Sequence, residues 1–274
     1  MNPVRGSHNK KVCTTIRDEF VKVEASNGVK RGPVIAIDGP AGSGKSTLAR
    51  LLAEKLCFTY IDTGAMYRAV ALRAYEQGID IEDEDSLKNL CSTINLYFTP
   101  PPAYPRKGGR KNVGGNQLNS NKIFIDGNDY SEKIRTPFVS RLSSKVSSQK
   151  AVRDAMVRLQ RLLAAKGSVI MEGRDIGTIV FPDADVKFYI DASPEVRGRR
   201  RYAELKEKGE NVSLDTIIAE EKARDKQDST REHAPLKKAD DAVLIDTSNM
   251  NLEEVLNVML KTVKERISIG NTCC

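Results

Sequence analysis

No hydrophobic run in this sequence approaches the roughly 18 to 20 residues that would span a bilayer. Hydrophobic residues make up 39% of the 274 residues and charged residues 30%, a balance typical of a soluble globular protein. Residues 1–32 also lack the apolar core of a signal peptide, and Asp18 and Glu19 argue against an organelle-targeting segment. We therefore expect a mostly disordered extension over residues 1–32 and no membrane partner.

Cysteine and histidine are scarce and show no metal-binding spacing. The chain contains Cys13, Cys57, Cys91, Cys273, Cys274, His8 and His233. These residues form no C-x-x-C pair and no ligand-like group, which argues against a zinc site. The odd number of cysteines argues against the disulfide framework of a secreted protein, so we expect the reducing cytoplasm.

The chain is basic. It has 44 Lys and Arg against 37 Asp and Glu, a formal charge of +7, and a pI of about 9.1. A positive surface can serve a nucleic acid or a site for polyanionic small molecules. Its length allows one α/β domain with a full core and a small appendage.

Residues 39–47 match the phosphate-loop pattern G-x-x-x-x-G-K-[ST]. A β-branched apolar run over residues 34–38 predicts a buried strand before it, and residues 47–56 have the apolar spacing of a helix after it. This arrangement directs backbone N–H groups and a helix dipole at an anion. Lys45 suits the β- and γ-phosphates and the Ser46 hydroxyl suits Mg²⁺. The predicted ATP-binding residues are Gly39, Pro40, Ala41, Gly42, Ser43, Gly44, Lys45, Ser46 and Thr47.

Strands and helices alternate through the rest of the chain. Further strands are predicted at residues 58–61, 169–172, 186–191 and 242–246, each followed by Asp, Gly, Ser or Thr and then a helical segment. This pattern predicts a parallel sheet wrapped by helices, with ligands beyond the carboxyl ends of its strands. One long helix is expected from residue 137 to about residue 166. Residues 95–98 and 122–127 predict a small second sheet, separated by a flexible basic loop over residues 99–121.

The sequence lacks two signals of a GTPase. It contains no D-x-x-G, and Asn121-Lys122-Ile123-Phe124 lacks the acid of a guanine-reading N-K-x-D. Arginines instead stand at or near predicted strand and helix ends: Arg68, Arg135 and Arg174. Further arginines lie in one helix (Arg197, Arg199, Arg200 and Arg201) and in another segment (Arg224 and Arg231). Phosphoryl transfer needs two anionic substrates brought into line and cations that offset the charge, and the forked guanidinium group suits phosphate oxygens. The pattern favours a small-molecule kinase.

From about residue 34 to residue 267, the sequence resembles the bacterial cytidylate kinases (CMP/dCMP kinases), which are nucleoside monophosphate kinases. The resemblance rests on these strings: Ile37-Asp38-Gly39-Pro40, Asp62-Thr63-Gly64-Ala65-Met66-Tyr67-Arg68, Ile134-Arg135-Thr136, Gly173-Arg174-Asp175-Ile176-Gly177-Thr178, and Arg224-Asp225 followed by Asp228 and Arg231. It implies an α/β fold with a five-stranded parallel sheet, a monophosphate-binding insert over about residues 63–135 and a lid over about residues 194–212. The kinase domain would then span residues 33–268, with a tail over residues 269–274.

The resemblance also implies the site residues. The acceptor nucleotide would be held by Thr63, Arg68, Arg135, Arg174, Asp175, Arg224, Asp228 and Arg231. Among these, Arg68, Arg135, Arg174 and Arg231 would grip the CMP phosphate, Asp228 would meet the sugar hydroxyls, and Asp175 and Thr63 would address the base or orient arginines. Lys45 and Arg174, with Arg200 and Arg201 of a lid that also contains Arg197, would neutralise the transferring group.

The predicted activity is Mg²⁺-ATP-dependent phosphorylation of CMP and dCMP by a monomeric cytoplasmic enzyme. The alternative enzymatic function is a kinase whose acceptor is UMP, AMP or shikimate. The alternative non-enzymatic function is nucleotide-dependent binding of a nucleic acid, which the pI and the basic loop 99–121 suggest.

Overall fold

The computed structural model describes residues 31–98, 122–165, 167–207 and 209–267. Its main sheet has five parallel strands in the order β2-β6-β1-β7-β8. The strands are β1 (Val34–Asp38), β2 (Thr59–Asp62), β6 (Val169–Gly173), β7 (Val186–Asp191) and β8 (Val243–Asp246). The predicted α/β fold with a five-stranded parallel sheet is confirmed.

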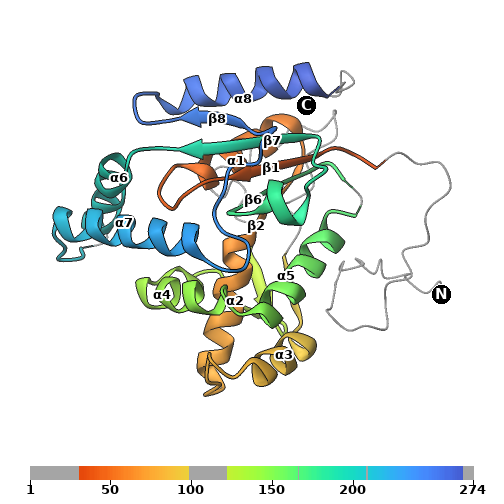
Figure 1. The fold of residues 1–274 in the computed structure, drawn as a ribbon, viewed down its shortest axis with the longest axis vertical. Coiled ribbons are helices and arrows are strands. Elements are labelled where there is room, and N and C mark those ends of the chain that lie inside the picture. Colours follow the sequence, from red (N-terminus) through yellow and green to blue (C-terminus); the bar gives the residue numbers. More distant parts are fainter. Residues whose placement is uncertain (1–30, 99–121, 166, 208, 268–274) are drawn as a thin grey trace, which may run out of the picture.

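The two faces of this sheet pack against different helices. Alternate residues of a strand point to opposite faces, so Val34 and Ala36 of β1 enter one core and Ile35 and Ile37 the other. The second core contains α1 (Lys45–Leu56) and α8 (Leu252–Arg266). Figure 1 shows α8 at one end of the molecule, the sheet beside it and helices α2 to α5 at the opposite end.

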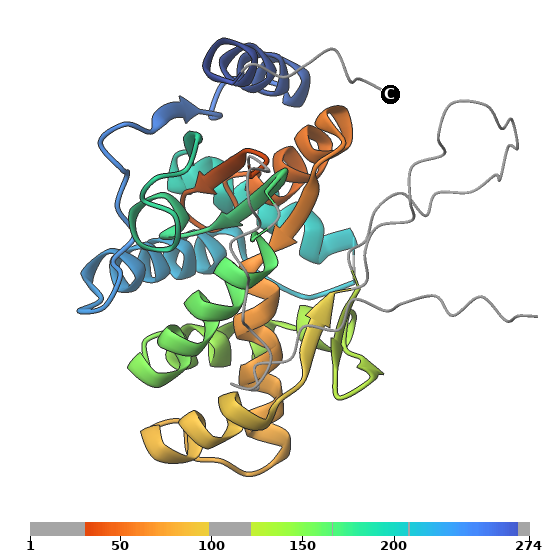
Figure 2. The ribbon, with the colours of Figure 1, turned by 90° about the vertical axis from the view of Figure 1, so that its right-hand side faces the viewer.

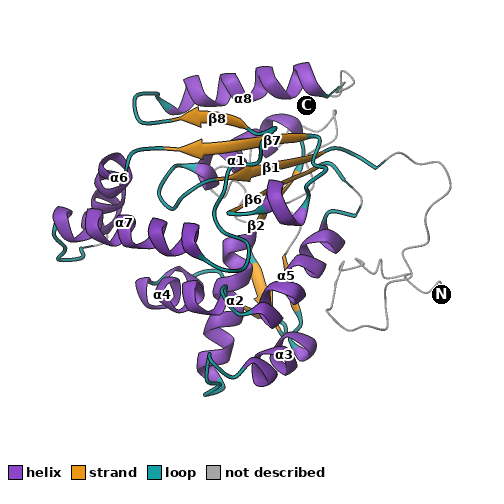
Figure 3. Ribbon diagram, viewed as in Figure 1, coloured by secondary structure: helices purple, strands orange, loops and turns teal. Residues whose placement is uncertain are grey.

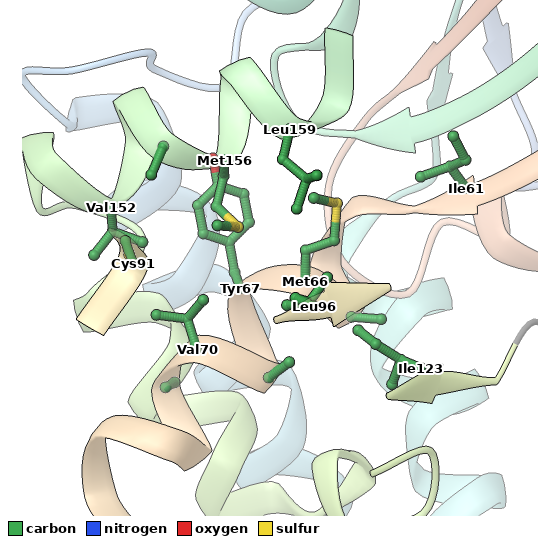
Figure 4. Close-up of a cluster of buried hydrophobic side chains, with 14 of the residues drawn as sticks. Ile61, Met66, Tyr67, Val70, Cys91, Leu96, Ile123, Val152, Met156 and Leu159 are labelled. Atoms are coloured by element: carbon green, nitrogen blue, oxygen red, sulfur yellow. The ribbon is translucent and has the colours of Figure 1, made fainter. Parts of the chain in front are cut away.

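The first core lies under helices α2 (Thr63–Glu76), α3 (Glu84–Thr93), α4 (Pro137–Val146) and α5 (Lys150–Leu163). In Figure 4, Tyr67 of α2 and Met156 of α5 point toward one another. Met156 is fully buried and Tyr67 is almost so, which fixes α5 against α2.

A small antiparallel sheet of β3 (Leu96–Phe98), β4 (Ile123–Ile125) and β5 (Asn128–Asp129) lies beside α2 (Figure 2). The predicted second sheet is therefore present, with β5 as an additional strand. A short 3₁₀ turn, η1 (Lys133–Arg135), leads into α4, whose first turn is capped by Thr136 with Pro137 at the first helical position.

Helices α6 (Pro194–Glu207) and α7 (Leu214–Thr230) form a hairpin beside the carboxyl ends of the strands. A Cβ on Gly198 would lie 2.4 Å from Ile218, so the two helices are in close contact there. In Figure 3 the arrows of β7 and β8 point toward the side of the molecule where α6 and α7 lie.

The expectation of one long helix from residue 137 to 166 is wrong. The chain forms two helices, α4 and α5, because Gln149 has extended backbone angles between them. The Ser147 and Ser148 hydroxyls donate hydrogen bonds to the carbonyls of Ser144 and Lys145. Such local serine bonds compete with the continuation of a helix. Helix α1 also starts two residues before the predicted Thr47, because Gly44, in the left-handed region, is its N-cap.

Several expectations fall outside the described residues. These are the structure of residues 1–30, the basic loop 99–121 and the tail 269–274. Within the described ranges, no helix is both long and apolar enough to cross a membrane.

Candidate functional site

A cavity of about 800 Å³ lies beyond the carboxyl ends of the parallel strands. It is lined by residues that the sequence placed far apart: Ala41 to Thr47, Thr63, Arg68, Arg135, Arg174, Asp175, Arg200, Arg201, Arg224, Asp228 and Arg231. Gly39 and Pro40 are not among the lining residues, although they belong to the same loop. The fold thus brings the predicted phosphate loop and the predicted arginines to one hollow.

The phosphate loop turns directly from β1 into α1. Gly39 has a φ of 145°, and a Cβ there would lie 2.0 Å from the Ile190 carbonyl oxygen. Gly42 and Gly44 have φ values of 70° and 92°, which disfavour residues with a Cβ. Because α1 begins at Lys45, the loop ends at the free N–H groups of a helix N-terminus, a site that favours anions.

Lys45 is a buried side chain that lines the cavity, and its Nζ donates to the Pro40 carbonyl oxygen at 2.5 Å. Burial and the repulsion of Arg174 lower its pKa to about 7, although Glu172 offers partial compensation. A phosphate group beside Lys45 would supply the missing negative charge. Charging the Lys45 amine therefore has a free-energy cost that an anionic ligand would relieve.

Ser46 and Glu172 place two side-chain oxygen donors next to Lys45. The Ser46 hydroxyl donates to Glu172 Oε2 at 2.9 Å, and the Tyr60 hydroxyl donates to the other carboxylate oxygen. Burial, with repulsion from Asp62, raises the pKa of Glu172. Mg²⁺ prefers a few hard oxygen ligands together with substrate phosphates, so the donor set fits this ion. The described residues contain no group of three or more His, Cys, Asp or Glu that could hold a metal.

Asp228 holds two arginines that line the same cavity. Its Oδ2 accepts from Arg174 Nε at 3.0 Å, and its Oδ1 pairs with Arg231 Nη2 at 3.1 Å. Burial of Asp228 would raise its pKa, but Arg174, Arg231 and Arg224 outweigh burial and lower it. The carboxylate is thus held ionised between cations.

Arg224 and Arg68 have unmet hydrogen-bonding capacity at the cavity. Within the described part of the chain, the Nε of each is buried without a hydrogen-bond partner. Burial and the neighbouring Arg174 lower the pKa of Arg224. Arg68 Nη2 pairs with Asp62 Oδ2 at 3.0 Å, and Asp62 also caps α2. A cluster of cations with unpartnered hydrogen-bond donors favours the binding of a further anion.

Thr63 and Arg135 lie at the same cavity in different settings. The Thr63 hydroxyl donates to the Glu172 carbonyl oxygen at 2.7 Å, which ties the start of α2 to the end of β6. Arg135 is exposed, and its Nε donates to the Ser131 carbonyl oxygen at 3.1 Å. Its guanidinium group therefore lies at the rim.

Asp175 forms a buried pair with Arg153, a lining residue that the sequence patterns did not single out. Arg153 Nη1 also donates to the Ser147 carbonyl oxygen at 3.5 Å. Both side chains are about 5% exposed. Arg153 stands within a helix, where spacing alone does not separate a surface arginine from a buried one. Glu172, a buried carboxylate bonded to Ser46, was not singled out either, because in the sequence it reads as part of a buried strand.

Three of the four arginines of α6 were expected near the triphosphate, and their surroundings differ. Arg200 donates to Thr247 Oγ1 at 3.1 Å and to the Thr247 carbonyl oxygen at 2.8 Å, while Arg201 pairs with Glu204 at 3.0 Å; both line the cavity. Arg197 departs from the expectation that it faces the triphosphate. It is 1% exposed, does not line the cavity, and is bonded to α7 and to the Ala41 carbonyl oxygen.

Comparison with known proteins agrees with this geometry. A family model described as cytidylate kinase matches residues 35–265. A cytidylate kinase from Geobacter sulfurreducens is 51% identical over 237 residues, which cover 86% of this chain and 95% of that protein. One from Syntrophotalea carbinolica is 51% identical over 238 residues, covering 87% and 94% of the two chains. The resemblance predicted from the motifs is confirmed, and the chain belongs to the cytidylate kinase family.

Proposed function

We propose that this protein transfers the γ-phosphoryl group of ATP to CMP or dCMP, giving ADP and the corresponding diphosphate. The observation that carries the proposal is one cavity lined by two sets of cationic groups from different elements. We assign Lys45 and the N-terminus of α1 to a donor side, and Arg174, Arg224 and Arg231 to an acceptor side. Two phosphate-bearing substrates can be held there in line, as phosphoryl transfer requires.

The donor side suits a triphosphate. Backbone N–H groups of residues 42–47 and the Lys45 ammonium group would hold the β- and γ-phosphates. Arg200 donates to the Ser43 carbonyl oxygen at 3.4 Å and Arg201 lines the same cavity, so both can offset charge on the transferring group. Bound Mg²⁺ would be held by Ser46 and Glu172 and would supply charge neutralisation between phosphate oxygens.

The acceptor side suits a nucleoside monophosphate. Arg68, Arg224 and Arg231 have donors at the cavity for a phosphate group, with Arg135 at its rim. Asp228 would accept hydrogen bonds from sugar hydroxyls while it holds Arg174 in place. The acceptor phosphate is already an anion, so its attack on the γ-phosphoryl group requires no general base from the protein. Closure of the cavity would exclude water that would otherwise hydrolyse ATP.

The Arg153–Asp175 pair favours cytosine over uracil. An ionised carboxylate only accepts hydrogen bonds, so Asp175 would accept from the exocyclic amino group of cytosine and repel the carbonyl oxygen that uracil has there. Arg153 donates, and would meet the O2 carbonyl oxygen or the N3 ring nitrogen of cytosine. Both groups are buried at the cavity, where a mismatched polar edge is costly.

An acceptor panel tests this proposal. ADP release is measured with Mg²⁺-ATP and CMP, dCMP, UMP, AMP or shikimate, with an enzyme-free control for each acceptor. We expect the highest kcat/KM with CMP or dCMP, and UMP lower by about tenfold or more. Turnover that no cytidine nucleotide stimulates, or a preference for AMP or shikimate, would refute it.

We further propose a monomeric enzyme in the cytoplasm. The support for a monomer is that one chain supplies both anion-binding sides of the cavity. Light scattering coupled to gel filtration tests it, since a stable dimer would elute with about twice the mass of 30.3 kDa.

A further inference from the structure

Arg197 is a buried cation that the proposed chemistry does not use. It is the largest of the fully buried side chains in the described part of the chain. Its Nε donates to the Ala192 carbonyl oxygen at 2.8 Å, and its Nη1 donates to Glu221 Oε2 at 3.2 Å. Its two Nη groups also form a bidentate pair with the Asp225 carboxylate. An enclosed guanidinium group with this many partners has one orientation.

One of its partners belongs to the phosphate loop. Arg197 Nη1 donates to the Ala41 carbonyl oxygen at 3.1 Å. The next residue, Gly42, lies directly against α6, because a Cβ there would be 3.1 Å from the Cβ of Arg197. The loop backbone that would surround the donor phosphates is therefore in direct contact with Arg197.

Its other partners belong to the helix that serves the acceptor side. Glu221 and Asp225 lie on α7, which also carries Arg224 and Asp228. Asp228 stands three residues after Asp225, about one helical turn away, and accepts a hydrogen bond from Arg174 at 3.0 Å. A displacement of α7 by the acceptor would therefore move the carboxylates that hold Arg197.

We propose that Arg197 is a positioning residue that couples acceptor binding to donor binding by tying α7 to the phosphate loop. The proposal deepens the proposed function and rests on it. Occupation of the acceptor side would stabilise the arrangement of α7 in which Arg197 holds the Ala41 carbonyl, and thus the donor-ready loop. Linkage requires that ATP raise the affinity for CMP by the same factor as CMP raises the affinity for ATP.

Calorimetric titration of the full chain tests the coupling. The dissociation constant of a non-hydrolysable ATP analogue with Mg²⁺ is measured with and without saturating CMP, and the reciprocal titration is made with CMP. We expect a coupling factor of about 5 or more in the wild type. In Arg197→Lys, a compact ammonium group cannot bond Ala41 and both oxygens of Asp225 together, so the factor should fall to about 1 in both directions.

Arg199→Lys is the matched control, since Arg199 is exposed on the same helix. It should keep the wild-type coupling factor. Asp225→Asn is the second test variant, because it keeps the side-chain volume and removes the charge that Arg197 grips. Each variant is checked for folding by circular dichroism before titration.

The outcomes separate the two proposals. A wild-type chain that binds neither nucleotide would refute the proposed function and with it the coupling. Binding of both nucleotides without coupling in the wild type, or unchanged coupling in folded Arg197→Lys, would overturn the role of Arg197 alone. Weaker binding of both ligands with unchanged coupling would assign Arg197 a purely structural role. Unfolding of both Arg197→Lys and Asp225→Asn would do the same.

Discussion

Binding of ATP should take up a proton above neutral pH, because Lys45 is held partly deprotonated in the free enzyme. Burial, Arg174 and Arg224 lower its pKa to about 7, with Glu172 and Asp38 as partial compensation. At pH 8 only about a tenth of the free molecules would carry a charged Lys45. Triphosphate oxygens beside the amine would restore its charge, so binding should take up about 0.9 proton.

The sign of the pH dependence follows from this shift. The protonated form binds the triphosphate, and the free enzyme loses that form as the pH rises through about 7. The dissociation constant for ATP should therefore increase by up to about tenfold for each pH unit above 7, until the pH reaches the pKa of Lys45 in the complex. Below pH 7 the contribution of the charged Lys45 to ATP binding should be fully present and nearly independent of pH.

Calorimetry at pH 8 in two buffers of different ionisation enthalpy measures the proton uptake, with a non-hydrolysable ATP analogue and Mg²⁺. Lys45→Arg is the control, because a guanidinium group stays protonated and should reduce the uptake to near zero. This variant also distinguishes proton uptake by Lys45 from proton uptake by Asp38, whose pKa is raised to about 7 by burial. Wild-type uptake near zero, or equal uptake in Lys45→Arg, would refute the reasoning.

Four further perturbations have defined outcomes. Asp228→Asn should raise the KM for CMP by about tenfold or more, with little change for ATP, and an equal rise in both would contradict its acceptor role. Asp175→Asn should lower the CMP-to-UMP ratio of kcat/KM by about tenfold in steady-state assays; an unchanged ratio would remove Asp175 from base selection. Glu172→Gln should raise the Mg²⁺ concentration for half-maximal activity by about tenfold, and an unchanged Mg²⁺ titration would exclude it as a ligand. Met156→Ala should lower the free energy of unfolding by about 3 kcal/mol in urea, whereas a loss below about 1 kcal/mol would show that α5 repacks.

Contiguous patterns predicted most of the fold. The strand, glycine loop and helix around Lys45 could be located because their signals lie within about 25 successive residues. The strands of the parallel sheet were also placed within one or two residues, since buried parallel strands are continuous apolar runs. The break at Ser147 and Ser148 was not predicted, because the hydrophobic spacing continues across it and only local hydroxyl bonds interrupt the helix.

The sequence alone determined which residue types could meet phosphate, since Lys45, Arg68, Arg174 and Arg231 stand in recognisable strings or at element ends. Tertiary structure alone decided which way each side chain points. It placed Arg153 at the cavity and turned Arg197 inward onto α7, although both are arginines within helices. The reason is physical: burial and ion pairing depend on carboxylates distant in the chain, and helical spacing carries no information about those partners.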